Sequence, residues 1–154
     1  MKKAALSVLV VAIGLLLAGT VLADSATKDE CMAKGKETAQ FINEKGLEAA
    51  VAELNKKDGK FAWKDSYVFL MDFSGKMLGH PNPKLVGVNT LEMTDKAEKG
   101  KPIFKEFVAV AKDKGEGWVD YMWPKPGETT PVKKVSYIYR VPGKDLLVGA
   151  GYYE

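Results

Sequence analysis

The stretch that decides the fold is Tyr67-Val-Phe-Leu-Met-Asp-Phe-Ser-Gly-Lys-Met-Leu-Gly-His-Pro-Asn-Pro83. Its first seven residues are aromatic, β-branched or long apolar side chains, apart from one aspartate, and this composition is typical of a β-strand. Successive strand side chains point to opposite faces, and here both faces are largely apolar. One face is expected to carry Tyr67, Phe69, Met71 and Phe73, and the other Val68, Leu70 and Asp72.

The second half of this stretch predicts a hairpin that leads into a loop. Ser74-Gly75 supplies a turn, and Met77-Leu78 begins a return strand. Pro81 and Pro83 remove backbone donors and end that strand. His80, immediately before the first of these prolines, is therefore expected in the loop that follows the hairpin.

The remaining elements are predicted from hydrophobic spacing. Apolar residues recur at helical spacing over 24–57, which predicts a long amphipathic helix broken at Gly46. A second apolar helical face follows Pro102 and runs to Lys112. Three more strands are expected, at 118–123, 135–141 and 146–152. This order favours an α+β fold, an antiparallel sheet of about five strands with the helices segregated to one side.

The first 23 residues indicate the compartment. Lys2 and Lys3 precede an apolar run from Ala4 to Leu22, and Val21-Leu-Ala23 offers small residues for cleavage. We interpret residues 1–23 as a signal peptide and 24–154 as one extracytoplasmic domain, periplasmic or secreted. The rival interpretation is an uncleaved membrane anchor, because the run is near the lower limit of about 17 residues for a spanning helix.

Composition argues against several classes of function. The chain carries a net charge of +3, and its lysines are scattered, which disfavours nucleic-acid binding. His80 is the only histidine and Cys31 the only cysteine, and two predicted elements separate them. Neither a Cys-His pair nor a multi-histidine metal site is therefore expected. Gly149-Ala-Gly151 is far from a dinucleotide fingerprint, and we interpret it as close strand packing. We therefore expect no enzymatic activity and no cofactor. An intermolecular disulfide through Cys31 stays open.

The strand, Gly turn and His-Pro of 67–83, together with Gly117-Trp-Val-Asp-Tyr-Met-Trp-Pro-Lys-Pro-Gly127 and the terminal Val148-Gly-Ala-Gly-Tyr152, resemble the single Cache family of the sCache_2 type. These are extracytoplasmic small-molecule sensing domains of bacteria, and the resemblance covers nearly all of residues 24–154. It implies a PAS-like fold with a long N-terminal helix, and a role in signal transduction such as chemotaxis.

The resemblance also nominates a ligand site between the sheet and the loops after the first hairpin. Its residues would be Phe69, Met71, His80, Tyr121, Trp123, Lys134 and Tyr137. Each has a simpler explanation in core packing or turn formation, and Lys134 is exposed in the simplest one. Lys134 and Tyr137 also have opposite parity on an ideal strand, so both reach one pocket only if a bulge or twist intervenes.

If Lys134 points inward, a carboxylate ligand follows, since a buried ammonium needs an anion. Acetate, propionate, lactate and pyruvate are the acids that the resemblance suggests. Cache domains generally lead into a kinase, cyclase or chemotaxis module, whereas Glu154 ends this sequence. We therefore expect a free periplasmic binding protein or a partner of a membrane receptor or kinase, with a homodimer through the N-terminal helix open. The alternative is a structural or interaction module with a vestigial pocket.

Overall fold

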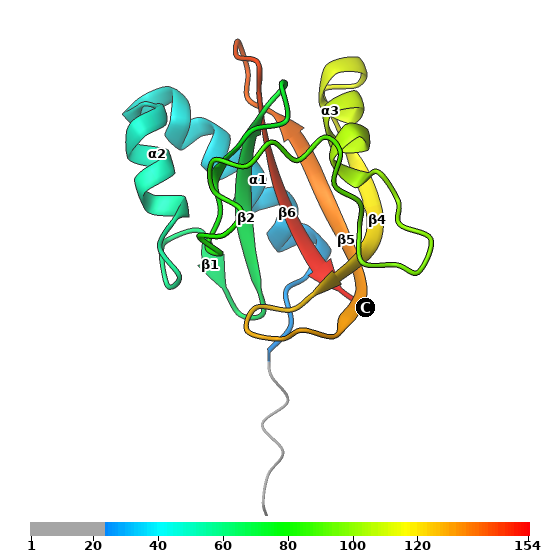
Figure 1. Ribbon diagram of the computed structural model, residues 1–154. Helices are drawn as coiled ribbons and strands as arrows, with labels where there is room; N and C mark the ends of the chain where they lie inside the picture. The colour runs from blue at the N-terminus through cyan, green and yellow to red at the C-terminus, as the bar shows by residue number, and fades with distance from the viewer. Residues whose placement is uncertain (1–23) are drawn as a thin grey trace, which may run out of the picture.

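A computed structural model describes residues 24–154 (Figure 1). The predicted signal peptide, and its rival the anchor, fall on residues 1–23 and lie outside the described residues. Within the described part, no helix combines the length and the apolar character that crossing a membrane requires.

The centre of the domain is an antiparallel sheet of six strands in the order β1-β2-β6-β5-β4, with β3 paired to β2 as well. The sheet thus has one strand more than the five predicted, because a two-residue strand, β1, precedes the first hairpin. The last strand in the sequence, β6, lies in the middle between β2 and β5 (Figure 1). The strands span Ala62–Trp63 (β1), Ser66–Asp72 (β2), Met77–Gly79 (β3), Glu116–Pro124 (β4), Pro131–Arg140 (β5) and Leu146–Tyr153 (β6).

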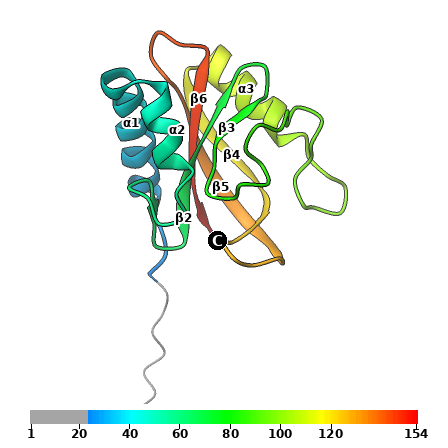
Figure 2. The ribbon, with the colours of Figure 1, turned by 60° about the vertical axis from the view of Figure 1, so that its left-hand side comes forward.

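Helices cover both faces of this sheet, so the expectation that they lie on one side is wrong (Figure 2). The first two helices, α1 (Lys28–Lys45) and α2 (Leu47–Leu54), pack on one face. The third helix, α3 (Ile103–Asp113), packs on the other face. The two faces are called the α1 face and the α3 face below. The physical reason is that both faces of β2 are apolar, and each needs its own cover.

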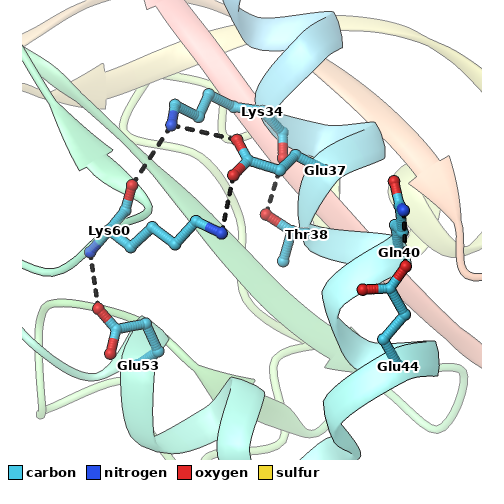
Figure 3. Close-up of polar contacts among 7 residues, drawn as sticks. All are labelled: Lys34, Glu37, Thr38, Gln40, Glu44, Glu53 and Lys60. Carbon is cyan, nitrogen blue, oxygen red and sulfur yellow. Dashed lines mark hydrogen bonds and ion pairs between the residues drawn. The ribbon is translucent and has the colours of Figure 1, made fainter.

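The break between α1 and α2 falls at Gly46, as predicted, where the backbone φ is 90°. Thr27 begins α1 through a capping box with Glu30. Ion pairs and hydrogen bonds then join the two helices through Lys60 (Figure 3). The Lys60 Nζ lies 2.9 Å from Glu37 of α1, and its backbone N–H donates to Glu53 of α2 over 2.7 Å.

The long connection between β3 and α3 lies on the α3 face, beside the helix (Figure 2). One buried carboxylate organises it. Asp95 accepts hydrogen bonds from the backbone N–H groups of Ala97, Lys101 and Met122, at 3.2, 2.7 and 2.9 Å. Because Met122 belongs to β4, these bonds attach the connection to the sheet. The α3 face is thereby closed by a helix and a loop.

Candidate functional site

Two hollows meet at the α3 face, and three side chains line both of them: Tyr67, His80 and Trp123. The outer hollow is a cleft of about 570 Å³ bounded by the turn that follows β1, the His-Pro loop and the loop 124–128. The inner hollow lies between the sheet and α3 and has a volume of about 10 Å³. That is room for about one water molecule. Tyr67, His80 and Trp123 therefore form the boundary between an open cleft and a nearly closed cavity.

Lys134 lies beside this boundary and is completely buried. Its ammonium stands 4.0 Å from the ring centre of Tyr67 and 4.8 Å from that of Tyr153. It has no hydrogen-bond partner among residues 24–154. Cation–π contacts contribute about 2 kcal/mol when desolvated, which is less than the several kcal/mol lost on burying an ammonium. The charge of Lys134 is thus only partly compensated by the described residues.

Trp63 is the second residue with a buried side-chain donor that has no partner in the described part of the chain. Its Nε1–H belongs to a side chain that lines the outer cleft. Unpaired buried donors are rare in proteins and call for an explanation. Both of them lie next to the hollows: Trp63 lines the outer cleft, and Lys134 contacts Tyr67 at the boundary.

His80 is held as a neutral donor. Its Nδ1 accepts the backbone N–H of Asn82 over 2.8 Å, so the ring proton resides on Nε2. Burial lowers the pKa of His80 to about 3, and the charge of Lys134 adds to this effect. The ring also packs against Tyr67 with 4.7 Å between centres. At neutral pH the site therefore presents an uncharged imidazole N–H beside an ammonium.

Two tyrosine hydroxyls on the same face are already bonded within the protein. Tyr121 shares a hydrogen bond of 2.9 Å with Ser136, and Tyr153 donates to the Pro124 carbonyl over 3.0 Å. Burial raises the pKa of both tyrosines well above its usual range. Both phenols are consequently neutral, and they add no negative charge that could pair with Lys134.

Of the seven residues predicted for the site, five come together. Phe69, His80, Tyr121 and Trp123 line the inner cavity, whereas Lys134 lines neither hollow and reaches the site through its contact with the ring of Tyr67. Met71 is buried in the same layer but does not line either hollow. Tyr137 lies on the α1 face, where its hydroxyl donates to Glu116. No bulge in β5 turns Tyr137 towards the α3 face, so Tyr137 and Lys134 lie on opposite faces of the sheet.

Sequence reasoning missed several residues that build the site. Tyr67 could have been found, because it shares the predicted face of Phe69. Tyr153 could not, since its position opposite Lys134 depends on the register between β5 and β6. The helix and loop contribute the remaining wall of the inner cavity, namely Leu85, Ile103, Phe104 and Phe107, together with Met77 of β3.

The family model described as Cache domain, dCache_2, matches residues 35–154. The chain therefore belongs to the Cache domain family, which comprises extracytoplasmic sensor domains that bind ligands and are not enzymes. The match confirms the resemblance to Cache domains that the sequence pattern suggested.

Two curated relatives place such a domain in signalling proteins. The chain is 39% identical over 90 residues to the methyl-accepting chemotaxis protein McpP of Pseudomonas putida, and 33% identical over 91 residues to the sensor histidine kinase MctS of Rhizobium johnstonii. Each match covers 58% of this chain, but only 16% and 19% of the respective relatives. The similarity thus concerns a small part of each relative.

Solved structures show the same fold. A periplasmic sensor domain of a chemotaxis protein has a TM-score of 0.64 and 29% identity, covering 81% of this chain and 88% of that one. A Cache chemosensory domain, solved as the structural basis for carboxylic acid recognition, has a TM-score of 0.63 and 32% identity, covering 81% and 86%.

Proposed function

We propose that this domain senses short-chain carboxylic acids outside the cytoplasm. The observation that carries the proposal is the buried ammonium of Lys134, which has no hydrogen-bond partner among the described residues. A carboxylate supplies both the missing negative charge and the missing acceptors, and charge-assisted hydrogen bonds of this kind are about twice as strong as neutral ones.

The surrounding groups favour a carboxylate over other anions or cations. The neutral His80 has a donor at Nε2, and both its ring and the Lys134 ammonium pack against Tyr67, at 4.7 and 4.0 Å from the centre of that ring. One acid group can therefore accept from both side chains. The walls of the inner cavity are aromatic and aliphatic, so the rest of the ligand should be apolar and small.

The inner cavity, about 10 Å³ as described, holds less than an acetate ion. Binding therefore requires the boundary side chains Tyr67, His80 and Trp123 to move, with the outer cleft as the route of access. Because any ligand has to enlarge this small cavity, the shortest acids should enter most easily, which favours the acetate, propionate, lactate or pyruvate class. The similarity to a Cache domain that recognises a carboxylic acid supports the same ligand class.

The cellular context is part of the proposal. We infer that residues 1–23 direct the domain across the cytoplasmic membrane, as a cleaved signal peptide or as an anchor. The relatives belong to a chemoreceptor and a sensor kinase, which supports coupling to a membrane receptor or kinase. In that role the domain would have no enzymatic activity of its own.

The test is calorimetric titration of purified ligand-free protein with short carboxylates, amino acids, purines and polyamines. We expect binding of one or more short acids, and loss of that binding in Lys134→Ala. Tyr137→Phe is the matched control, because Tyr137 lies on the opposite face of the sheet and should leave the affinity unchanged.

Two results would overturn the proposal. If Lys134→Ala binds an acid with the same affinity as the wild-type protein, Lys134 does not take part in binding. Absence of heat with every compound, in protein shown to be ligand-free, would instead favour an interaction module with a vestigial pocket.

A further inference from the structure

Gly151 occupies a position where any side chain would collide with the candidate site. It lies in β6, paired with Ser136 of β5. A Cβ atom added to Gly151 would stand 2.7 Å from Lys134 Cε and 2.2 Å from Ser136 Oγ. Real Cβ atoms essentially never come this close to other heavy atoms. The space above Gly151 is therefore filled by side chains from the neighbouring strand.

Backbone conformation does not explain the glycine. Positive φ angles occur at seven other glycines of the described chain, and Gly151 is not among them. Alanine could adopt the extended conformation of this strand. The absence of a side chain at Gly151 thus matters for space alone.

The strand order shows what the space is used for. Lys134 starts on β5, and its ammonium lies over the ring of Tyr67 on β2, with β6 between the two strands. Two strand spacings amount to about 9.5 Å, so the lysine has to run almost flat across β6 to reach that ring. It crosses β6 at Gly151, where its Cε makes the close approach.

We propose that Gly151 is a positioning residue of the acid site. Because it has no side chain, the Lys134 side chain can cross β6 and place its ammonium at the boundary between the two hollows. The space above Gly151 also accommodates the Ser136 hydroxyl, which shares a hydrogen bond with Tyr121. This inference rests on the proposed function for its effect on affinity, but the position of Lys134 can be measured without any ligand.

The first measurement follows the side chain of Lys134 by NMR in protein labelled with ¹³C at the lysine Cε. Because the ammonium lies over two aromatic rings, ring currents shift the Lys134 Hε signals, and Lys134→Met identifies them by their loss. We expect Gly151→Ala to move these signals towards ordinary lysine values. The control is Gly35→Ala, whose Cβ would lie 3.1 Å from Tyr137 on the α1 face. That control should leave the Lys134 signals in place.

The second measurement is the affinity for the best-bound short acid. We expect Gly151→Ala to weaken it by about tenfold or more, the loss of one charge-assisted hydrogen bond. Gly35→Ala should keep the affinity even where it lowers the melting temperature. If the wild-type protein binds no acid, the proposed function fails, yet the Lys134 signals still decide whether Gly151 positions the lysine.

A double-mutant cycle covers the case in which Gly151→Ala folds poorly. If the alanine collides with Lys134 and Ser136, truncating both should restore much of the melting temperature, so Gly151→Ala should cost less in a Lys134→Ala/Ser136→Ala background. An equal cost in both backgrounds would overturn the inference. Unchanged Lys134 signals together with unchanged affinity in Gly151→Ala would overturn it as well.

Discussion

Replacing Lys134 by methionine should stabilise the ligand-free domain and abolish its response to acids. Methionine keeps most of the length and volume of the side chain and fills the same path across β6. It removes an ammonium that is fully buried and has no hydrogen-bond partner in the described domain. Stability and function should therefore change in opposite directions at this one position.

The magnitude follows from two opposing contributions. Burying an ammonium costs several kcal/mol, and the two ring contacts with Tyr67 and Tyr153 return about 2 kcal/mol or somewhat more. We expect a net gain of about 1 to 3 kcal/mol for methionine, consistent with the gain of about 1 to 4 kcal/mol when buried ion pairs are replaced by apolar residues. In a domain of this size, that raises the melting temperature by roughly 3 to 15 °C.

The assay is thermal unfolding at neutral pH, with and without the best-bound acid. Wild-type protein at about 100 times the dissociation constant should gain about 2.7 kcal/mol, while Lys134→Met should gain nothing. Lys133→Met is the control, since the neighbouring lysine is half exposed and pairs with Glu154 at 2.7 Å. A lower melting temperature for Lys134→Met, or an acid-induced shift that survives the substitution, would refute the reasoning.

Three further predictions concern other buried groups. The pKa of His80 is lowered to about 3, so the unfolded chain takes up a proton below pH 6.5 and the folded one does not. The free energy of unfolding should therefore fall by about 2 kcal/mol between pH 6.5 and 5. His80→Gln should remove most of this slope, because carboxyl groups with a lowered pKa contribute mainly below pH 5. Asp95→Asn should lower the free energy of unfolding by about 1 to 3 kcal/mol, because an amide group cannot accept all three backbone donors. Hydrogen exchange of the amides bonded to Asp95 should become faster, and unchanged exchange would contradict this. Cys31 is fully buried and its pKa is raised to about 12, so a thiol reagent should label it only after unfolding, contrary to an intermolecular disulfide in the native state; labelling of native protein would show otherwise.

The sequence predicted the elements well because their signals are local. Alternation of side chains assigned both faces of β2 correctly, and Gly46 marked the break between the first two helices. The prediction that all helices lie on one side of the sheet was wrong. The alternation of apolar side chains along β2 already indicated that both faces need cover. A strand with Val68 and Leu70 on one face and Tyr67 and Phe69 on the other needs apolar cover on both, which one helical layer cannot give.

The site was harder to predict because it depends on pairing between strands. The alternation of side chains along β5 predicted that Lys134 and Tyr137 point to opposite faces of the sheet, and the structure agrees. Whether Lys134 is buried depends on what the next strand places beneath it. That is Gly151, which is 17 positions later in the sequence and becomes a neighbour only through the register of β5 and β6.

The residues on the α3 face are better suited to a ligand-bound site than to an empty one. A methionine at 134 would avoid a buried charge, and any hydrogen-bond acceptor beside Lys134 would compensate it. Neither is present among the described residues: the ammonium faces two aromatic rings and has no hydrogen-bond partner there. This uncompensated ammonium destabilises the empty site and, under the proposed function, favours an anion with apolar bulk no larger than a few carbons. The binding energy of a small acid, which has few atoms with which to make contacts, can then be large because much of it comes from relieving a penalty that the empty domain already carries.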